Sequence, residues 1–408
     1  MRVERGLGRR FRLLWAAFAT SAAGTWLAFD AFPLIAILVL HAGPVEVSLL
    51  AAAGPAAGAL LATLAGPFVA ARRPQPVMIG ADLVRFAVLA TVPVAYLLGW
   101  LGVPQLLVVA VVVAAADIAF TAASGAFLKS VVAPRDLLVA NGRFESTTWV
   151  ATAVGPPLGG FAVGVLGPVT TVVANAASFL ASAGWIRRIG PVAEEPVVAA
   201  SKVRPADLVE GWRVLLRHPV LRPLLLNVVA VNSLIMATAP LAAVLMLGEL
   251  GFAPWQYALA FGAPCVGGLV GARMSRRLVE RFGESAVLRV GGTLRAVWSG
   301  VIAFVPAGPW GIVLVIAVQF WLVGCAGVFN PVLATTRLRL LPDESVVRAL
   351  TAWSVSTKAA IAVVTALWGL LAAATGPRVA IAVAGVLLLA TPLLLPRRVR
   401  AAAEDAGR

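Results

Sequence analysis

Charge is what this sequence has least of. Only 12% of its 408 residues are Asp, Glu, Lys or Arg, while 61% are hydrophobic and the mean hydropathy is +0.95. Ordinary globular domains carry roughly 25% charged residues. A soluble chain of this length would need more charge to cover its surface. The composition therefore excludes an ordinary soluble protein and indicates a polytopic membrane protein.

Cysteine and histidine are also scarce. Cys265 and Cys325 are single residues inside apolar runs, and His41 and His218 are too few to form a cluster. No spacing of these residues fits a metal site. A GxxxxGK[ST] phosphate loop is missing as well, so ATP is not the expected energy source. Because no constellation of catalytic residues is present, we expect neither enzymatic activity nor a cofactor.

Long apolar runs fill most of the chain. A membrane-spanning helix needs roughly 17–25 predominantly apolar residues, and twelve runs reach that length. The first is too long for the core of a signal peptide, so we expect it to be retained. The predicted fold class is an all-α polytopic membrane protein with twelve transmembrane helices. The runs cover residues 13–40, 46–70, 77–101, 104–128, 144–166, 169–188, 220–247, 255–275, 285–306, 309–333, 346–374 and 378–396.

The 33 Lys and Arg residues fall mostly on one side of this arrangement. They precede the first span, follow the second, fourth and sixth, and surround the eighth-to-ninth connection. Others, with Lys358 counted among them, surround the tenth-to-eleventh connection, while Arg378 falls on the opposite side. Short cytoplasmic loops are enriched in Lys and Arg, so both termini are predicted to be cytoplasmic. The net charge of +15 then reflects the orientation of the protein in the membrane and does not predict binding of nucleic acid.

Residues 189–219 separate two sets of six spans. The predicted domains are an N-terminal half over residues 1–188, a cytoplasmic linker over residues 189–219 and a C-terminal half over residues 220–408. Within the linker, Asp207–Arg217 has one apolar and one charged face, typical of a helix in the membrane interface or of an ordinary amphipathic loop helix. The halves echo each other, because Arg85 in the third span corresponds to Arg295 in the ninth.

Two such halves resemble the major facilitator superfamily of transporters. The stretches Phe11–Trp15, Ala81–Arg85, Asn175–Phe179 and Glu210–Arg222 are similar to the branch that contains enterobactin exporters and macrolide efflux pumps. The resemblance implies two pseudo-symmetric six-helix bundles that rock around a midplane site in the lipid bilayer. It also implies a monomer with a small-molecule substrate. A composition rich in Ala, Gly and Arg and poor in Lys is typical of a high-GC bacterium, which places the protein in the bacterial inner (plasma) membrane.

The fifth span contains a string that resembles the antiporter motif of drug–proton exchangers in this superfamily. Its glycines allow another helix to approach closely, and its two prolines bend the helix. The motif implies secondary active export of a hydrophobic or amphipathic small molecule, such as a drug, siderophore or secondary metabolite, in exchange for protons. A solute importer of the same fold and a non-transporting membrane scaffold or sensor are the alternatives. The motif residues are Gly155, Pro156, Pro157, Gly159 and Gly160.

The loop after the second span departs from the superfamily pattern. The superfamily normally has an acid four residues after a glycine, but here Gly66 is followed by Pro-Phe-Val-Ala70. The corresponding position after Gly271 is Ser275. An ion pair that uses these positions in gating is therefore in doubt.

Ionisable residues within spans are the sharpest candidates for function, because each costs at least about 2.5–3.5 kcal/mol at the bilayer centre. Asp30 is a candidate for proton coupling or for contact with a cationic substrate. The alternative is that its carboxyl lies near the outer mouth of the cavity and is only hydrated. Asp117 is a candidate for lining the substrate cavity. The alternative is that it only forms a structural hydrogen bond to a neighbouring helix.

Other polar residues are candidates for gating or for the cavity. Asp82 and Arg85 are one helical turn apart and predict an ion pair near the cytoplasmic end of the third span. Arg143 and Glu145 open the fifth span and predict a gate between the halves. Amides within or near spans are further cavity candidates, although they also serve as contacts between helices. These amides are Asn175, Asn227 and Asn330.

Overall fold

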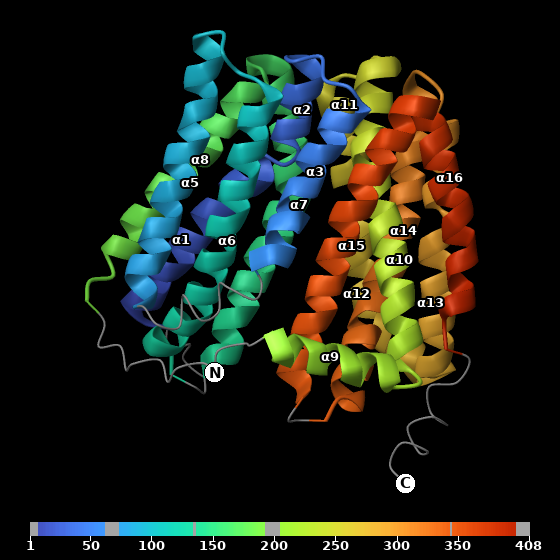
Figure 1. Cartoon of the computed structure of the whole chain (residues 1–408). Coiled ribbons are helices and arrows are strands. Elements are labelled where there is room, and N and C mark those ends of the chain that lie inside the picture. Colours follow the sequence, from blue (N-terminus) through green and yellow to red (C-terminus); the bar gives the residue numbers. More distant parts are fainter. Residues whose placement is uncertain (1–6, 62–72, 134–135, 192–204, 343–344, 397–408) are drawn as a thin grey trace. The chain divides into compact units, whose positions relative to one another are not determined.

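The computed structural model describes residues 7–61, 73–133, 136–191, 205–342 and 345–396, and every regular element in these ranges is a helix (Figure 1). Within these ranges, twelve helical segments are long and apolar enough to cross a membrane, from Gly8–Leu38 to Pro377–Leu394. They coincide with the twelve runs predicted from the sequence. The prediction of an all-α membrane protein with twelve spans is confirmed. The loop that contains Gly66 lies outside the described residues.

The helices pack into two compact units. Unit 1 comprises Met1–Ile35 and Leu60–Val203, and unit 2 comprises Ala36–Ala59 and Arg204–Arg408. Residues 36–59, which belong to the predicted N-terminal half, pack with unit 2, and the predicted domain bounds stay a prediction.

Unit 1 is a bundle in which α8 packs against both α1 and α5, α5 against α6, and α1 against α7. Its buried cluster includes Phe11, Met78, Phe127 and Ile186, which come from four different helices. The packing of the unit therefore ties the first span to the fifth and sixth. The helices are α1 Gly8–Leu27, the first part of α2 Ala31–Leu38, α5 Pro74–Leu97, α6 Val103–Val131, α7 Leu137–Leu166 and α8 Pro168–Arg187.

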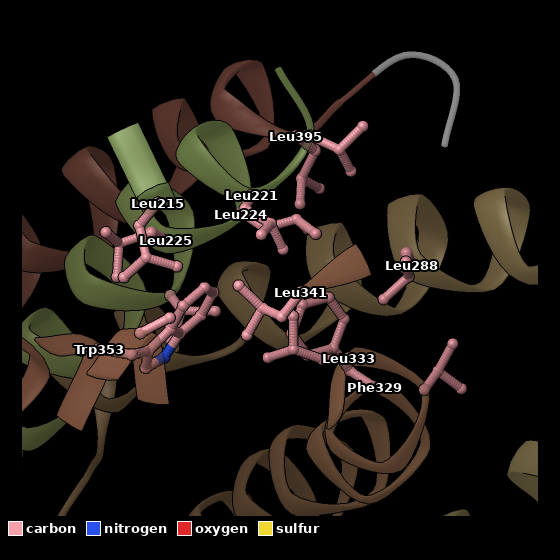
Figure 2. Close-up of a cluster of buried hydrophobic side chains, with 14 of the residues drawn as sticks. Leu215, Leu221, Leu224, Leu225, Leu288, Phe329, Leu333, Leu341, Trp353 and Leu395 are labelled. Atoms are coloured by element: carbon pink, nitrogen blue, oxygen red, sulfur yellow. The ribbon is translucent and has the colours of Figure 1, made fainter. Parts of the chain in front are cut away.

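Unit 2 packs α12 and α13 against α14, and α10 against α15 and α16. A cluster of buried leucines with Phe329 and Trp353 joins the ends of several of these helices (Figure 2). Its elements are α3 Pro44–Leu61 up to residue 59, α9 Pro205–Arg217, α10 Leu221–Ala243, the π-helical turn Val244–Glu249, α11 Pro254–Gly262, α12 Cys265–Phe282, α13 Glu284–Val297, the 3-10 turn Ser299–Phe304, α14 Pro309–Leu340, α15 Val346–Thr375, α16 Pro377–Ala390 and the 3-10 turn Thr391–Leu394.

The same glycine–proline turn joins the last two spans of each predicted half. Gly167 ends α7 and precedes Pro168 of α8, and Gly376 ends α15 and precedes Pro377 of α16. Their φ and ψ angles are 85° and 159° for Gly167 and 87° and 154° for Gly376. A positive φ is readily adopted only by glycine, and proline is well suited to the first helical turn. The repeat that the sequence indicates is thus present in the backbone geometry.

The linker helix α9 packs along unit 2, across the ends of α10 and α15 (Figure 1). Leu215 is fully buried, and the indole Nε1 of Trp212 donates a hydrogen bond of 2.9 Å to Ser356 on α15. On the charged face, Arg348 and Glu210 form an ion pair of 2.8 Å. Part of the apolar face of α9 is therefore occupied by protein.

His218 connects α9 to α10. Its Nδ1 accepts hydrogen bonds from the amides of Val220 and Leu221 at 3.1 and 3.3 Å. These amides are among the orphan donors at the start of α10. Burial lowers the pKa of His218, so the folded state favours the neutral imidazole that this cap requires.

Candidate functional site

The first span is interrupted between α1 and α2. Asp30 lies in the break with a φ of 57°, in the left-handed region that residues other than glycine rarely adopt. Its backbone carbonyl accepts a hydrogen bond of 2.9 Å from the Leu34 amide, and its side chain is half-buried. The candidate carboxyl of Asp30 is thus held at an interruption of a membrane-spanning helix.

The antiporter-like string of α7 lies against the end of α1. A side-chain carbon added at Gly155 would lie 2.5 Å from the Cβ of Trp26, and one at Gly159 would overlap the carbonyl oxygen of Leu27. The contact therefore requires glycine at both positions. Between them, Pro156 and Pro157 have no amide hydrogen to donate along the helix, and Pro156 and Gly160 are buried. The string meets α1 at Leu27, the last residue before the interruption that contains Asp30.

Arg85 holds two carboxylates from different helices. Its Nη2 donates to Asp82 Oδ1 at 2.5 Å on α5, and its Nη1 donates to Asp117 Oδ1 on α6 at 3.0 Å. The guanidinium also lies over the rings of Phe120 and Phe179, with its carbon 4.6 and 4.1 Å from their centroids. The structure thus pairs Asp82 with Arg85, as the helical spacing predicts, and adds Asp117 from 32 residues away.

Asp117 differs from its partners in exposure. Its side chain is 63% exposed, whereas the side chains of Asp82 and Arg85 are buried. Asp117 lies fourteen residues from each end of α6, or about 21 Å at 1.5 Å per residue. An ionised carboxylate at such a depth is unfavourable in hydrocarbon. This position favours a face of α6 that meets water.

Unit 2 repeats the buried arginine with a different partner. Arg295 on α13 donates from Nη2 to Asn227 Oδ1 on α10 at 2.8 Å and lies over the ring of Phe329, 3.9 Å from its centroid. The Asn227 Nδ2 in turn donates to the carbonyl oxygen of Thr391 at 2.8 Å. Asn227 is fully buried, and both ends of its amide bind protein groups. The structure places this cavity candidate in a helix contact.

The other predicted amides lie apart from one another. Asn175 is buried on α8, where a side-chain carbon added at Gly24 of α1 would lie 3.2 Å from its Oδ1. It therefore sits at the close contact between α1 and α8. Asn330 is exposed on α14, directly before Pro331.

The predicted gate residues lie at the start of α7. Arg143 and Glu145 are both exposed. Arg143 lines an open cavity of about 700 Å³ together with Trp15 of α1 and Thr147 of α7, and the indole Nε1 of Trp15 donates to Thr147 Oγ1 at 2.9 Å. Among the described residues, no group of three or more His, Cys, Asp or Glu side chains is arranged to hold a metal ion.

A family model described as the Major Facilitator Superfamily matches residues 13–336. The chain belongs to this superfamily. It is 29% identical over 342 residues to the multidrug efflux pump Tap of Mycolicibacterium fortuitum, which covers 79% of this chain and 80% of the pump. It is 22% identical over 281 residues to the uncharacterized MFS-type transporter YvqJ of Bacillus subtilis (strain 168), which covers 67% and 66% of the two chains. The resemblance inferred from the sequence is confirmed.

Solved structures agree on the fold of this superfamily member. The nucleoside transporter NupG has a TM-score of 0.75 at 10% identity and covers 95% of this chain and 99% of its own. A bacterial homologue of the iron transporter ferroportin, in an inward-facing state, has a TM-score of 0.70 at 18% identity and covers 94% and 98%. At such identities the likeness concerns architecture alone.

Sequence reasoning placed one charged residue of this transporter-family chain wrongly. The sequence pattern predicts Lys358 among the basic residues of the tenth-to-eleventh connection, but the structure puts it inside α15 and inside the span Arg348–Thr375. The error has a simple origin, because Arg337, Arg339 and Arg348 come shortly before it and suggest one basic cluster. Its distance from the start of the apolar run at residue 346 is the signal that identifies it as intramembrane.

Proposed function

We propose that this superfamily member exports a hydrophobic or amphipathic small molecule from the cytoplasm, in exchange for protons, by alternating access. Its place is the bacterial inner membrane, with both termini in the cytoplasm. The observation that carries the proposal is the contact of Gly155 and Gly159 with the last residues of α1, next to the break at Asp30. The likeness to a multidrug efflux pump supports the direction.

The contact between α1 and α7 supports a moving part. Glycines let the helix backbones meet without interlocking side chains, so the two helices can slide with little steric resistance. Pro156 and Pro157 remove two hydrogen bonds of the α7 ladder and make it easier to bend there. Discontinuous helices near the midplane are typical of the sites at which secondary transporters bind their substrates and coupling ions. A change in the bend of α7 would therefore act directly on the break beside Asp30.

The cluster of Asp82, Arg85 and Asp117 supplies the proton site of this proposal. Two carboxylates and one guanidinium leave a net charge of −1 when all three are ionised, so one proton neutralises the cluster. Asp117 is the exposed member, and through it the cluster meets water. Protonation of the cluster weakens its charge-assisted bonds, and one of these joins Arg85 on α5 to Asp117 on α6, which couples the proton to the packing of the two helices. Asp30 is the second carboxyl within reach of the moving contact.

The test is dye accumulation in everted vesicles that contain the full chain, with an acid interior to impose the proton gradient. Rhodamine 6G, which is a cation, and dansylglycine, which is an organic anion, serve as probes. Export predicts uptake that stops when the gradient is collapsed, that is lost in Asp117→Asn and that is partly restored in Asp117→Glu. The matched control is Glu280→Gln, which removes a carboxylate from an exposed pair with Arg276.

Two results would contradict the proposal in different ways. Gradient-driven uptake that survives Asp117→Asn and Asp30→Asn would remove the proton-site assignment and leave export in place. Accumulation only in right-side-out vesicles would establish import instead. A chain that moves neither dye in either orientation would contradict export of this class of molecule.

A further inference from the structure

The most unusual charge in the described residues is the ammonium of Lys358. It lies ten residues after Arg348 and seventeen before Thr375 in the eleventh span, or about 15 Å and about 25 Å along the helix axis. Lysines near helix ends extend their side chains to the membrane surface, but this one lies well inside the span. An ionisable residue at such a depth is by default a candidate for a functional site.

Lys358 lies against α3, with which α15 forms an antiparallel pair in unit 2. A side-chain carbon added at Gly369 would meet Ser48, and one added at Gly58 would lie 2.8 Å from the Cδ and 3.2 Å from the Nζ of Lys358. These two contacts run in opposite directions along the two helices, as an antiparallel pair requires. Gly58 therefore provides the space in which the ammonium lies. The side chain is half-buried, so the ammonium is not sealed inside the protein.

Within the described residues, Lys358 forms neither an ion pair nor a hydrogen bond. Two other cations deep in spans are matched, because Arg85 binds two carboxylates and Arg295 binds the Asn227 amide. The nearest hydroxyls on α15 do not compensate, since Ser356 and Thr357 donate back to the helix carbonyls of residues 352 and 353. Charges inside a membrane protein normally pair with another group. Lys358 is thus a donor of three hydrogen bonds with none satisfied inside the described part of the chain.

We propose that Lys358 binds the anionic group of the transported molecule, so that the substrate is an amphipathic organic acid carrying a carboxylate or sulfonate. This inference rests on the proposed transport of a small molecule and specifies its class. The ammonium provides a point charge that accepts anions of different shape, unlike the planar fork of arginine. Ala362, one helical turn after Lys358 on the same face of α15, has a small side chain, so that turn places no bulky group over the charge. A cationic substrate would be repelled at the same position.

Binding of two fluorescent probes to the purified full chain in nanodiscs tests this. Dansylglycine and dansylcadaverine share a fluorophore and carry opposite charges. The wild type should bind dansylglycine at least about tenfold more tightly than dansylcadaverine, about 1.4 kcal/mol. Lys358→Met should lose that preference, Lys358→Arg should retain most of it, and Gly58→Val should weaken dansylglycine binding because its side chain displaces the ammonium. Arg276→Gln, which removes an exposed charge, should bind as the wild type does.

Stability separates recognition from a structural role. Lys358→Met removes a charge from the membrane interior, so its unfolding midpoint in detergent should be equal to or above that of the wild type. A lowered midpoint together with unchanged probe preference would mean that the lysine is structural and would overturn the proposal. A wild type without preference for dansylglycine, including one that binds neither probe, would overturn it as well. Because the binding assay needs no gradient, Lys358-dependent binding without gradient-driven transport would support this inference and contradict the proposed function instead.

Discussion

Replacing Asn227 with alanine removes the partner of a buried guanidinium. The Asn227 Oδ1 accepts a hydrogen bond of 2.8 Å from Arg295, and its Nδ2 donates one of 2.8 Å to Thr391. A hydrogen bond to a charged group contributes about 1.5–3 kcal/mol, and one between neutral groups about 0.5–1.5 kcal/mol. We therefore expect the free energy of unfolding to fall by about 2–4.5 kcal/mol. The protein should still insert and fold, because the surrounding helices keep their apolar contacts.

The measurement is unfolding by titration with sodium dodecyl sulfate in mixed micelles, followed by tryptophan fluorescence. The single variant also creates a cavity, so the bond to Arg295 is isolated with a double-mutant cycle that adds Arg295→Met. In the Arg295→Met background, Asn227→Ala should lose only the Thr391 bond and the cavity contribution. The coupling energy should be about 1.5–3 kcal/mol. A coupling below about 0.5 kcal/mol, within the additivity error of such cycles, would refute the reasoning.

Three other substitutions test the remaining contacts. Gly159→Ala should lower the free energy of unfolding by about 1–3 kcal/mol and stop dye uptake, because the added methyl group overlaps the α1 backbone. Gly184→Ala on α8 should change neither quantity, since nothing lies within 4 Å of a side-chain carbon added there. The pKa of His218 is lowered in the folded state. Its contribution to stability should therefore be complete above about pH 6.5 and decline as the pH falls from there through the folded pKa. His218→Asn also caps the helix and should remove that pH dependence in the same detergent titration. Trp212→Phe deletes the 2.9 Å hydrogen bond to Ser356 and should lower the free energy of unfolding by about 0.5–1.5 kcal/mol. It should also make α9 more accessible to limited proteolysis, and unchanged cleavage would contradict the docking of α9.

The sequence predicts the spans well because their signal is local. A run of apolar residues long enough for the bilayer is readable without any neighbour, and prolines such as Pro168 and Pro377 mark where helices begin. The pairing of Asp82 with Arg85 is equally local, since side chains three residues apart lie on the same face of a helix. These features follow from helix geometry alone.

Contacts between distant segments are beyond such reasoning. The bond from Arg85 to Asp117 and the bond from Arg295 to Asn227 join residues 32 and 68 positions apart, and nothing in the intervening sequence specifies which helices become neighbours. The break at Asp30 is similar, because a single residue with positive φ leaves little trace in an apolar run. For Lys358 the signal was present in its distance from the helix start, and the cluster of arginines before it obscured that distance.

The two arginine sites show how one repeated frame can take on two tasks. In each predicted half a guanidinium from the third span lies over a phenylalanine ring of the fourth, as with Phe120 and Phe329. Unit 1 surrounds its guanidinium with two carboxylates, so the ionised cluster is at −1, a charge that one proton would neutralise. Unit 2 places an amide beside its guanidinium, so that site stays at +1, and Lys358 adds a further positive charge inside a span of the same unit. On our proposals, protons are then the ligand of unit 1 and organic anions the ligand of unit 2. The assignment is decided by side chains that differ between the repeats, and the fold that the repeats share leaves it open.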